Sequence, residues 1–213
     1  MQKAIFSRID LNNADNDLAQ EYLSCIRDLL HLHDVQDLKA FTQHMNTSRF
    51  QHSLNVSYYT FLIARRFHLD SCSAARAGLL HDLYHYDWRN LDKEERPIEG
   101  RHCAVHPQIA LENARKATFV NTIIEDAIVH HMWPMTLRCP KTKEAGFCRL
   151  LINTAPSAKF FCRVEEECDI PDLLFHWLHC FPSAFDSTYI QIMLCLGFIS
   201  GHSFFLLSNE HAA

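Results

Sequence analysis

The chain has few of the residues that mark secreted or strand-rich proteins. Only 5 of its 213 residues are glycine, and no stretch keeps the apolar–polar alternation of a half-buried strand. The N-terminal segment, MQKAIFSRIDLNN, contains no apolar core of the secretory type. The nine cysteines form no Cys-x-x-Cys pair, so we do not expect a zinc ribbon or finger. These features predict a mainly helical, cytoplasmic protein with reduced thiols.

Positive charge and long apolar runs are scarce as well. With 20 basic and 25 acidic residues, the formal net charge is -5, so no nucleic acid polymer is expected as a partner. One apolar stretch, residues 189–207, approaches the length of a membrane span. Gln191, His202 and two serines interrupt it, so a membrane association is not expected. The length allows one well-buried core.

Helical spacing of apolar residues, together with capping residues, predicts a series of helices. Thr47 or Ser48 can cap one helix, Ser71 or Ser73 the next, and Asn121 a later one. Pro107 suits a first helical position. The expected helices cover residues 15–32, 35–44, 48–67, 71–82, 107–118 and 121–131, and residues 88–105 and 138–143 are expected to be loops.

Histidine is abundant, with fifteen residues, and several lie at the ends or on one face of the expected helices. A pair of metal ions about 3.5–4 Å apart needs several imidazoles and a carboxylate that can bridge. The small residues before His81-Asp82, among them Ala77 and Gly78, would let that helix pack closely on the one that carries His52. Any one histidine on its own is more often a core or surface residue than a ligand. The candidate metal ligands are His52, His81, Asp82, His106, His130 and His131.

The order His, His-Asp, His, His-His resembles the HD-domain superfamily of metal-dependent phosphohydrolases. The phrases GLLHDLYHYDW, HPQIALENARK and HMWPMT are similar to small single-domain members from Gram-positive bacteria. The resemblance covers roughly residues 45–145 and implies an all-α, HD-domain-like helical bundle over residues 1–145. It implies that His52, His81 and Asp82 hold one metal ion and that Asp82 bridges to a second, held by His106, His130 and His131. His102 is expected to support this site without binding metal.

The same resemblance implies hydrolysis of a small phosphoester, such as a nucleotide, with His81 and Asp82 at the catalytic centre. One or two divalent ions of iron, manganese, cobalt or zinc would suit these ligands. Arg49, Lys141 and Lys143 are candidate phosphate contacts by their charge, although each could equally be a solvated surface residue. The alternatives are a metal- or nucleotide-binding module without turnover, and a purely structural helical protein that binds no metal.

The chain departs from the family pattern after Glu144. The pattern ends with an aspartate, typically within Asp-Lys-x-Cys, whereas this chain continues as AGFCRLLINTAPSAKFFCRVEEE. Loss of that carboxylate should weaken metal binding. Composition changes at the same point, because residues 146–213 hold nine of the fifteen phenylalanines but one lysine. We therefore treat residues 146–213 as a separate C-terminal segment, and one hypothesis is that the reading frame slips near Ala145-Gly146.

The codon table supports this hypothesis. If the last base of each codon is joined to the first two of the next, starting at the Leu151–Ile152 junction, the permitted residues include Asp-Lys-Tyr-Cys-Ala and then Glu-Val-Phe. We expect the nucleotide sequence to encode that motif, and a stop codon there would refute the hypothesis. The alternative is a genuine divergent segment with helices at 171–181 and 189–207.

Overall fold

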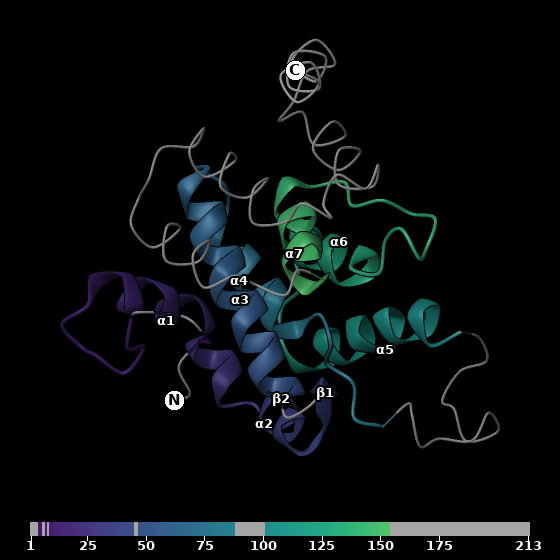
Figure 1. Ribbon diagram of the computed structural model, residues 1–213, viewed down its shortest axis with the longest axis horizontal. Coiled ribbons are helices and arrows are strands. Elements are labelled where there is room, and N and C mark those ends of the chain that lie inside the picture. Colours follow the sequence, from purple (N-terminus) through teal and green to yellow (C-terminus); the bar gives the residue numbers. More distant parts are fainter. Residues whose placement is uncertain (1–3, 6, 8, 45–46, 88–100, 154–213) are drawn as a thin grey trace, which may run out of the picture.

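Helices dominate the computed structural model of the protein, which describes residues 4–5, 7, 9–44, 47–87 and 101–153 (Figure 1). The predicted all-α class is confirmed, since the described residues hold one sheet, the short antiparallel pair β1–β2. The elements are α1 (Asp17–Leu30), α2 (His33–Asp37), the 3-10 helix η1 (Leu38–Ala40), β1 (Thr42–His44), β2 (Thr47–Ser48), α3 (Arg49–Arg66), α4 (Ser71–Leu80), α5 (His102–Ala117), α6 (Thr122–His130) and α7 (Lys143–Asn153).

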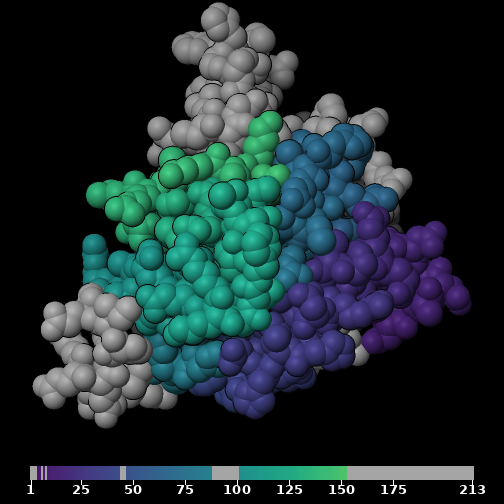
Figure 2. All heavy atoms as spheres, turned by 180° about the vertical axis from the view of Figure 1, so that it is seen from behind, coloured from purple at the N-terminus to yellow at the C-terminus, as the bar shows by residue number. Residues whose placement is uncertain are grey.

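Helices α3 and α4 form the centre of the fold. Helix α1 lies on one side of this pair and helices α5, α6 and α7 lie on the other (Figure 1). On α3, the apolar residues Leu54, Tyr58, Phe61 and Leu62 all lie in the core. In the space-filling view from behind, the segments of α5–α7 gather on one part of the surface, beside those of α1 and α2 (Figure 2). The central pair therefore connects two groups of helices.

Close contact between α3 and α4 depends on Gly78. A Cβ atom at this position would lie 2.6 Å from Ser57 Cα and 2.7 Å from Ser57 N, which are backbone atoms that cannot rotate away. On the α1 side, the Ser57 hydroxyl donates to the Ala75 carbonyl at 2.7 Å and accepts from the Tyr22 hydroxyl at 2.9 Å. The predicted close packing of these helices is thus observed, and it brings the His81 end of α4 toward α3.

Replacing Gly78 with alanine is expected to lower the free energy of unfolding by about 3 kcal/mol, because the added methyl group must push the two helices apart. Urea denaturation measures this loss. The control is Cys72→Ala at an exposed position of the same helix, which should change stability by less than about 0.5 kcal/mol. Equal stability of the Gly78 variant and the control would contradict the close packing.

Several expected helix boundaries are wrong. The helix expected over 35–44 is replaced by α2, η1 and strand β1. Asp70, not Ser71 or Ser73, caps α4, and its side chain accepts from the Ser73 N–H. Pro107 lies inside α5, which begins five residues earlier at His102, because Ala104 and Val105 N–H groups already close a turn on the Arg101 carbonyl. By contrast, Ser48 and Asn121 cap α3 and α6 as predicted.

Helix α7 continues past residue 145, where we placed the domain boundary. Ala145, Phe147, Cys148 and Leu151 are buried in the common core. The expectations for residues 154–213, including helices at 171–181 and 189–207, lie outside the described residues. Among the described residues, no helix combines the length and the apolar character that a membrane crossing requires.

Candidate metal centre

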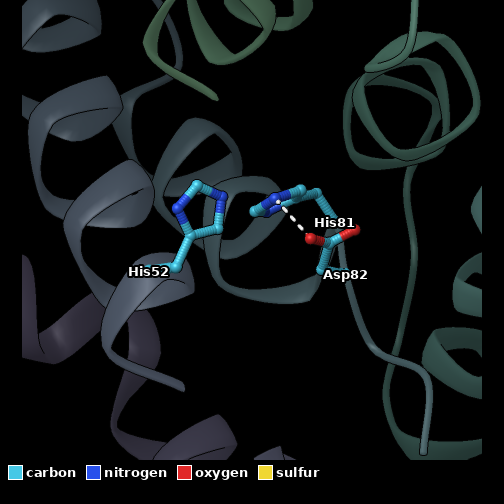
Figure 3. A group of neighbouring side chains, drawn as sticks. All are labelled: His52, His81 and Asp82. Carbon is cyan, nitrogen blue, oxygen red and sulfur yellow. Dashed lines mark ion pairs between the residues drawn. The ribbon is translucent and has the colours of Figure 1, made fainter. Parts of the chain in front are cut away.

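Four helices bring imidazole rings to one place. His52 lies on the first turn of α3, His81 and Asp82 follow the last turn of α4, His106 lies on α5, and His131 follows α6. The ring centroids form a continuous series, with His52 5.3 Å from His81, His81 5.2 Å from His131, and His131 4.7 Å from His106. Figure 3 shows His52 facing the His81-Asp82 pair from the neighbouring helix. The rings therefore converge, as the metal hypothesis requires.

Asp82 is shared between two groups of side chains that could each hold a metal ion. One group is His52, His81 and Asp82, the other is Asp82, His106 and His131, and within each group the ligand atoms lie within 4.8 Å of one another. Asp82 Oδ2 lies 3.4 Å from His81 Nε2 (Figure 3). Asp82 Oδ1 lies 3.3 Å from His106 Nε2 and 3.5 Å from His131 Nε2. A carboxylate between two ligand groups is the arrangement that can bridge two metal ions.

Backbone carbonyls fix the orientation of three of these rings. The Nδ1 atoms of His81, His106 and His131 lie 2.8, 2.7 and 2.7 Å from the carbonyl oxygens of Gly78, His102 and Ile128. A carbonyl can only accept, so each Nδ1 carries the hydrogen and each Nε2 offers its lone pair to the centre. Such a hydrogen bond is the usual support of a histidine that binds metal.

The donor atoms at the centre fit a cation. His106 Nε2 and His131 Nε2 lie 2.7 Å apart, and two acceptors this close repel each other unless they share a proton or a metal ion. His81 Nε2 and Asp82 Oδ1 are buried and have no hydrogen-bond partner within the described ranges. Buried polar atoms without partners are costly, and a bound metal ion would satisfy them. The residues present therefore suit a divalent metal with nitrogen and oxygen ligands.

Burial and charge set the protonation of the centre. Burial lowers the pKa of His131 well below its usual 6.5, with the neighbouring His106 and His81 adding to the effect and Asp82 opposing it. Burial alone would raise the pKa of Asp82, but the surrounding imidazoles, His81 first, outweigh burial and hold that pKa well below 3.8. A neutral imidazole and an ionised carboxylate are the forms that bind metal.

These pKa values predict a pH dependence for the metal-free protein. Because both pKa values are lower in the folded state than in the unfolded chain, the folded state binds fewer protons and stability rises with pH. The contribution of His131 is present above pH 6.5 and is lost as the pH falls from there, and that of Asp82 is lost only below 3.8. Urea denaturation in EDTA should show the free energy of unfolding falling from pH 7.5 to 5, by up to about 1.4 kcal/mol per pH unit for His131.

The control for this prediction is His131→Gln, which has no titrating imidazole and should show a smaller fall over the same range. If stability were constant or rose as the pH decreased, the assignment of a neutral, buried His131 would be wrong.

Comparison with known families agrees with this geometry. Residues 49–152 match the HD domain. This part of the chain belongs to the HD-domain family. The match begins at the first residue of α3 and ends in the last turn of α7, so it includes all the helices that carry the convergent histidines. The HD-domain family is one of metal-dependent phosphohydrolases, as the resemblance implied. No curated protein and no solved structure matches the chain.

Gln43 and Arg49 support the Asp82 end of the HD-domain centre. The Gln43 side-chain amide donates to Asp82 Oδ2 at 2.7 Å, and its carbonyl oxygen accepts from Arg49 Nε at 3.2 Å. Arg49 is fully buried, and its terminal nitrogens donate to the carbonyls of Tyr84 at 2.6 Å and Tyr86 at 3.3 Å. Its guanidinium also lies 3.7 Å from the centroid of the Tyr84 ring. The guanidinium of Arg49 therefore donates its hydrogen bonds to groups inside the protein. These contacts do not support the predicted role of Arg49 as a phosphate contact.

His130 belongs to neither ligand group of the HD domain. Its Nδ1 lies 2.7 Å from Asp126 Oδ1, one turn back on α6. The other Asp126 oxygen accepts from the backbone N–H groups of Lys141 and Thr142, both at 2.8 Å, just before α7 begins. The predicted metal-binding role of His130 is thus not supported by the groups that converge, and the pair Asp126–His130 instead joins α6 to the start of α7.

Three predicted residues remain. Lys141 precedes α7 and Lys143 is its first residue; both are exposed, and their phosphate-binding role stays a prediction. His102 stacks on His106, with ring centroids 4.4 Å apart, and supplies the carbonyl that holds the His106 ring, as its expected supporting role requires.

Sequence reasoning missed two supporting residues, Gln43 and Asp126. The spacing Asp126-x-x-x-His130 places both side chains on one helix face and could have been recognised. Gln43 had no such signal, because its contact with Asp82 joins residues 39 positions apart and depends on how β1 folds against the centre.

Proposed function

We propose that this chain is a metal-dependent phosphohydrolase that acts on a small phosphorylated substrate, most simply a nucleotide. The observation that carries the proposal is the sharing of Asp82 between two convergent groups, His52 and His81 on one side and His106 and His131 on the other. When bound, divalent metal ions would offset negative charge on phosphoryl oxygens and supply a water acidic enough to attack near neutral pH. His81 and Asp82 are the residues we propose at the catalytic centre.

The chain's own residues prepare this chemistry. Carbonyls of Gly78, His102 and Ile128 keep three imidazoles oriented, and Gln43 keeps the Asp82 carboxylate oriented. Because these side chains are already held in place, they need not reorient when negative charge develops on the phosphoryl group. Lys141 and Lys143, both exposed, are proposed to attract the anionic substrate.

A second candidate function is metal or nucleotide binding without turnover. It is favoured by the ligand set, because within the described ranges the two convergent groups contain Asp82 as their single carboxylate. Two histidines and a shared aspartate should hold the first metal weakly, which would reduce catalysis more than it reduces metal binding at the second group.

Metal analysis together with an activity assay separates the two functions. The full chain is purified, its metal content is measured by mass spectrometry, and hydrolysis of p-nitrophenyl phosphate and bis-p-nitrophenyl phosphate is followed with added manganese. Hydrolysis that His81→Ala abolishes supports the enzyme, and bound metal without hydrolysis supports the binding module. A protein without stoichiometric metal would refute both. Arg115→Gln, at an exposed arginine that pairs with Glu125, is the matched control.

A further inference from the structure

A pocket of about 390 Å³ lies apart from the metal centre, between the beginning of α5 and the segment that follows α6. On α5, His106 belongs to the metal centre and the His102 ring stacks on it, whereas Ala104 and Gln108 line the pocket. Residues two positions apart lie on nearly opposite sides of a helix, so the pocket is on another face of α5. On the other wall, His130 lines the pocket while the next residue, His131, belongs to the metal centre.

Two arginines give this pocket a positive charge. Arg101 and Arg138 both line it, one at the start of α5 and one in the segment between α6 and α7. Both are exposed, and neither guanidinium takes part in an ion pair within the described ranges. Arginine side chains presented in this way suit an anion with several oxygens, for which they can form paired, charge-assisted hydrogen bonds.

Two further polar side chains in the pocket have an atom that can form a hydrogen bond with a ligand. The His130 ring is fixed through Nδ1 by Asp126, whose second oxygen is occupied by Lys141 and Thr142, so Nε2 is the nitrogen left for a ligand. Thr136 also lines the pocket, and its hydroxyl is buried with no hydrogen-bond partner in the described part of the chain. A buried hydroxyl without a partner is destabilising, and a ligand that reached it would remove that cost.

Apart from Gln108, the rest of the lining is mainly apolar. Val129, Met135 and Leu137 line the pocket, and Met135 and Leu137 are 62% and 99% exposed. Apolar walls with a few polar groups are typical of small-molecule sites, whose volumes begin at roughly 300 Å³. A ligand for this pocket therefore combines an anionic group with a compact apolar or aromatic part.

We propose that this pocket binds a small organic phosphate about the size of a mononucleotide. Its phosphate would contact Arg101 and Arg138, a polar edge would reach His130 or Thr136, and its apolar part would lie on Val129 and Met135. The site goes beyond the proposed hydrolysis, because it lies on another face of α5 and needs no metal ion. It would hold a ligand whether or not the metal centre turns over substrate.

Calorimetric titration of the full chain with AMP tests this site, with adenosine and inorganic phosphate as separate probes. We expect AMP to bind, and Arg101→Gln and Arg138→Gln each to weaken the affinity about tenfold or more, since each removes a charge-assisted contact. Both arginines are exposed, so the variants should fold. The matched control is Arg115→Gln, an exposed arginine of α5 that does not line the pocket, which should leave the affinity unchanged. Adenosine and inorganic phosphate alone should each bind more weakly than AMP.

Alkylation of a cysteine in the pocket then tests where AMP binds. Cys103 lines the pocket, so AMP should slow its alkylation by iodoacetamide, whereas the exposed Cys72 on α4 should react at the same rate with and without AMP. Thr136→Val should weaken AMP binding while thermal stability stays equal or rises, because an unpaired buried hydroxyl is removed. A residue that served only the fold would lower stability instead.

The result that overturns the proposal is AMP binding that EDTA abolishes and that Arg101→Gln with Arg138→Gln leaves intact. That outcome would assign the affinity to the metal centre and leave the proposed hydrolysis standing. Absence of AMP binding at millimolar concentration would also overturn it. Conversely, AMP binding that persists in EDTA and needs both arginines would support the pocket even if no phosphoester were hydrolysed.

Discussion

Replacing Asp82 with asparagine is expected to empty both metal-binding groups and to lower phosphoester hydrolysis more than about 100-fold. Loss of a residue that only supports a ligand typically costs about 10–100-fold in metal affinity or activity, and a ligand shared by two metals should cost more. Asparagine keeps the shape of the side chain but removes the charge that both groups share. Metal content by mass spectrometry and hydrolysis of a chromogenic phosphoester measure the two effects.

Variants of the histidines give the matched controls for Asp82→Asn. His52→Gln should remove the metal of the first group and His106→Gln that of the second, because these residues belong to different groups. His130→Gln should leave the metal content unchanged, since His130 contacts Asp126 and not the convergent ligand atoms. If Asp82→Asn retained one metal ion while His52→Gln lost both, the shared role of Asp82 would be refuted.

Replacing Ile152 with aspartate is expected to raise metal affinity by about tenfold or more. In the hypothesis of a shifted reading frame, the codons permit an aspartate at the Leu151–Ile152 junction, in the last turn of α7. One turn earlier, on the same face, the buried Cys148 lies close enough to Asp82 to be influenced by its charge. Burial raises the pKa of Cys148 to about 12, with Asp82 adding to the effect. A carboxylate at residue 152 would therefore approach the metal centre.

The stability of the Ile152 variant should depend on metal. Without metal, an added carboxylate near Asp82 is repelled and partly desolvated, so the melting temperature should fall below that of the natural chain. With manganese, the carboxylate gains a cation, and the melting temperature should recover. Ile152→Asn is the control, because it has nearly the same shape without charge. Equal metal affinity of the two variants would show that α7 does not supply the missing ligand.

The main features of the fold could be predicted from the sequence because they depend on local signals. Helical spacing and the capping residues Ser48 and Asn121 correctly predicted the starts of α3 and α6. Failures came where distant contacts outweighed local preference. Pro107 suits a helix start, but the contact of His106 with His102 requires one more turn before it. Residues 42–44 leave the predicted helix to pair with β2, which positions Gln43 against Asp82.

The sequence by itself determined that helices would carry histidines and a His-Asp pair in the order of the HD-domain family, because side-chain spacing and capping act within a few residues. Only the tertiary structure decided which of them meet. His130 and His131 are adjacent in the chain, yet 100° of helical rotation directs one to Asp126 and a separate pocket and the other to Asp82. That choice depends on how α4, α5 and α6 pack, which no local pattern specifies.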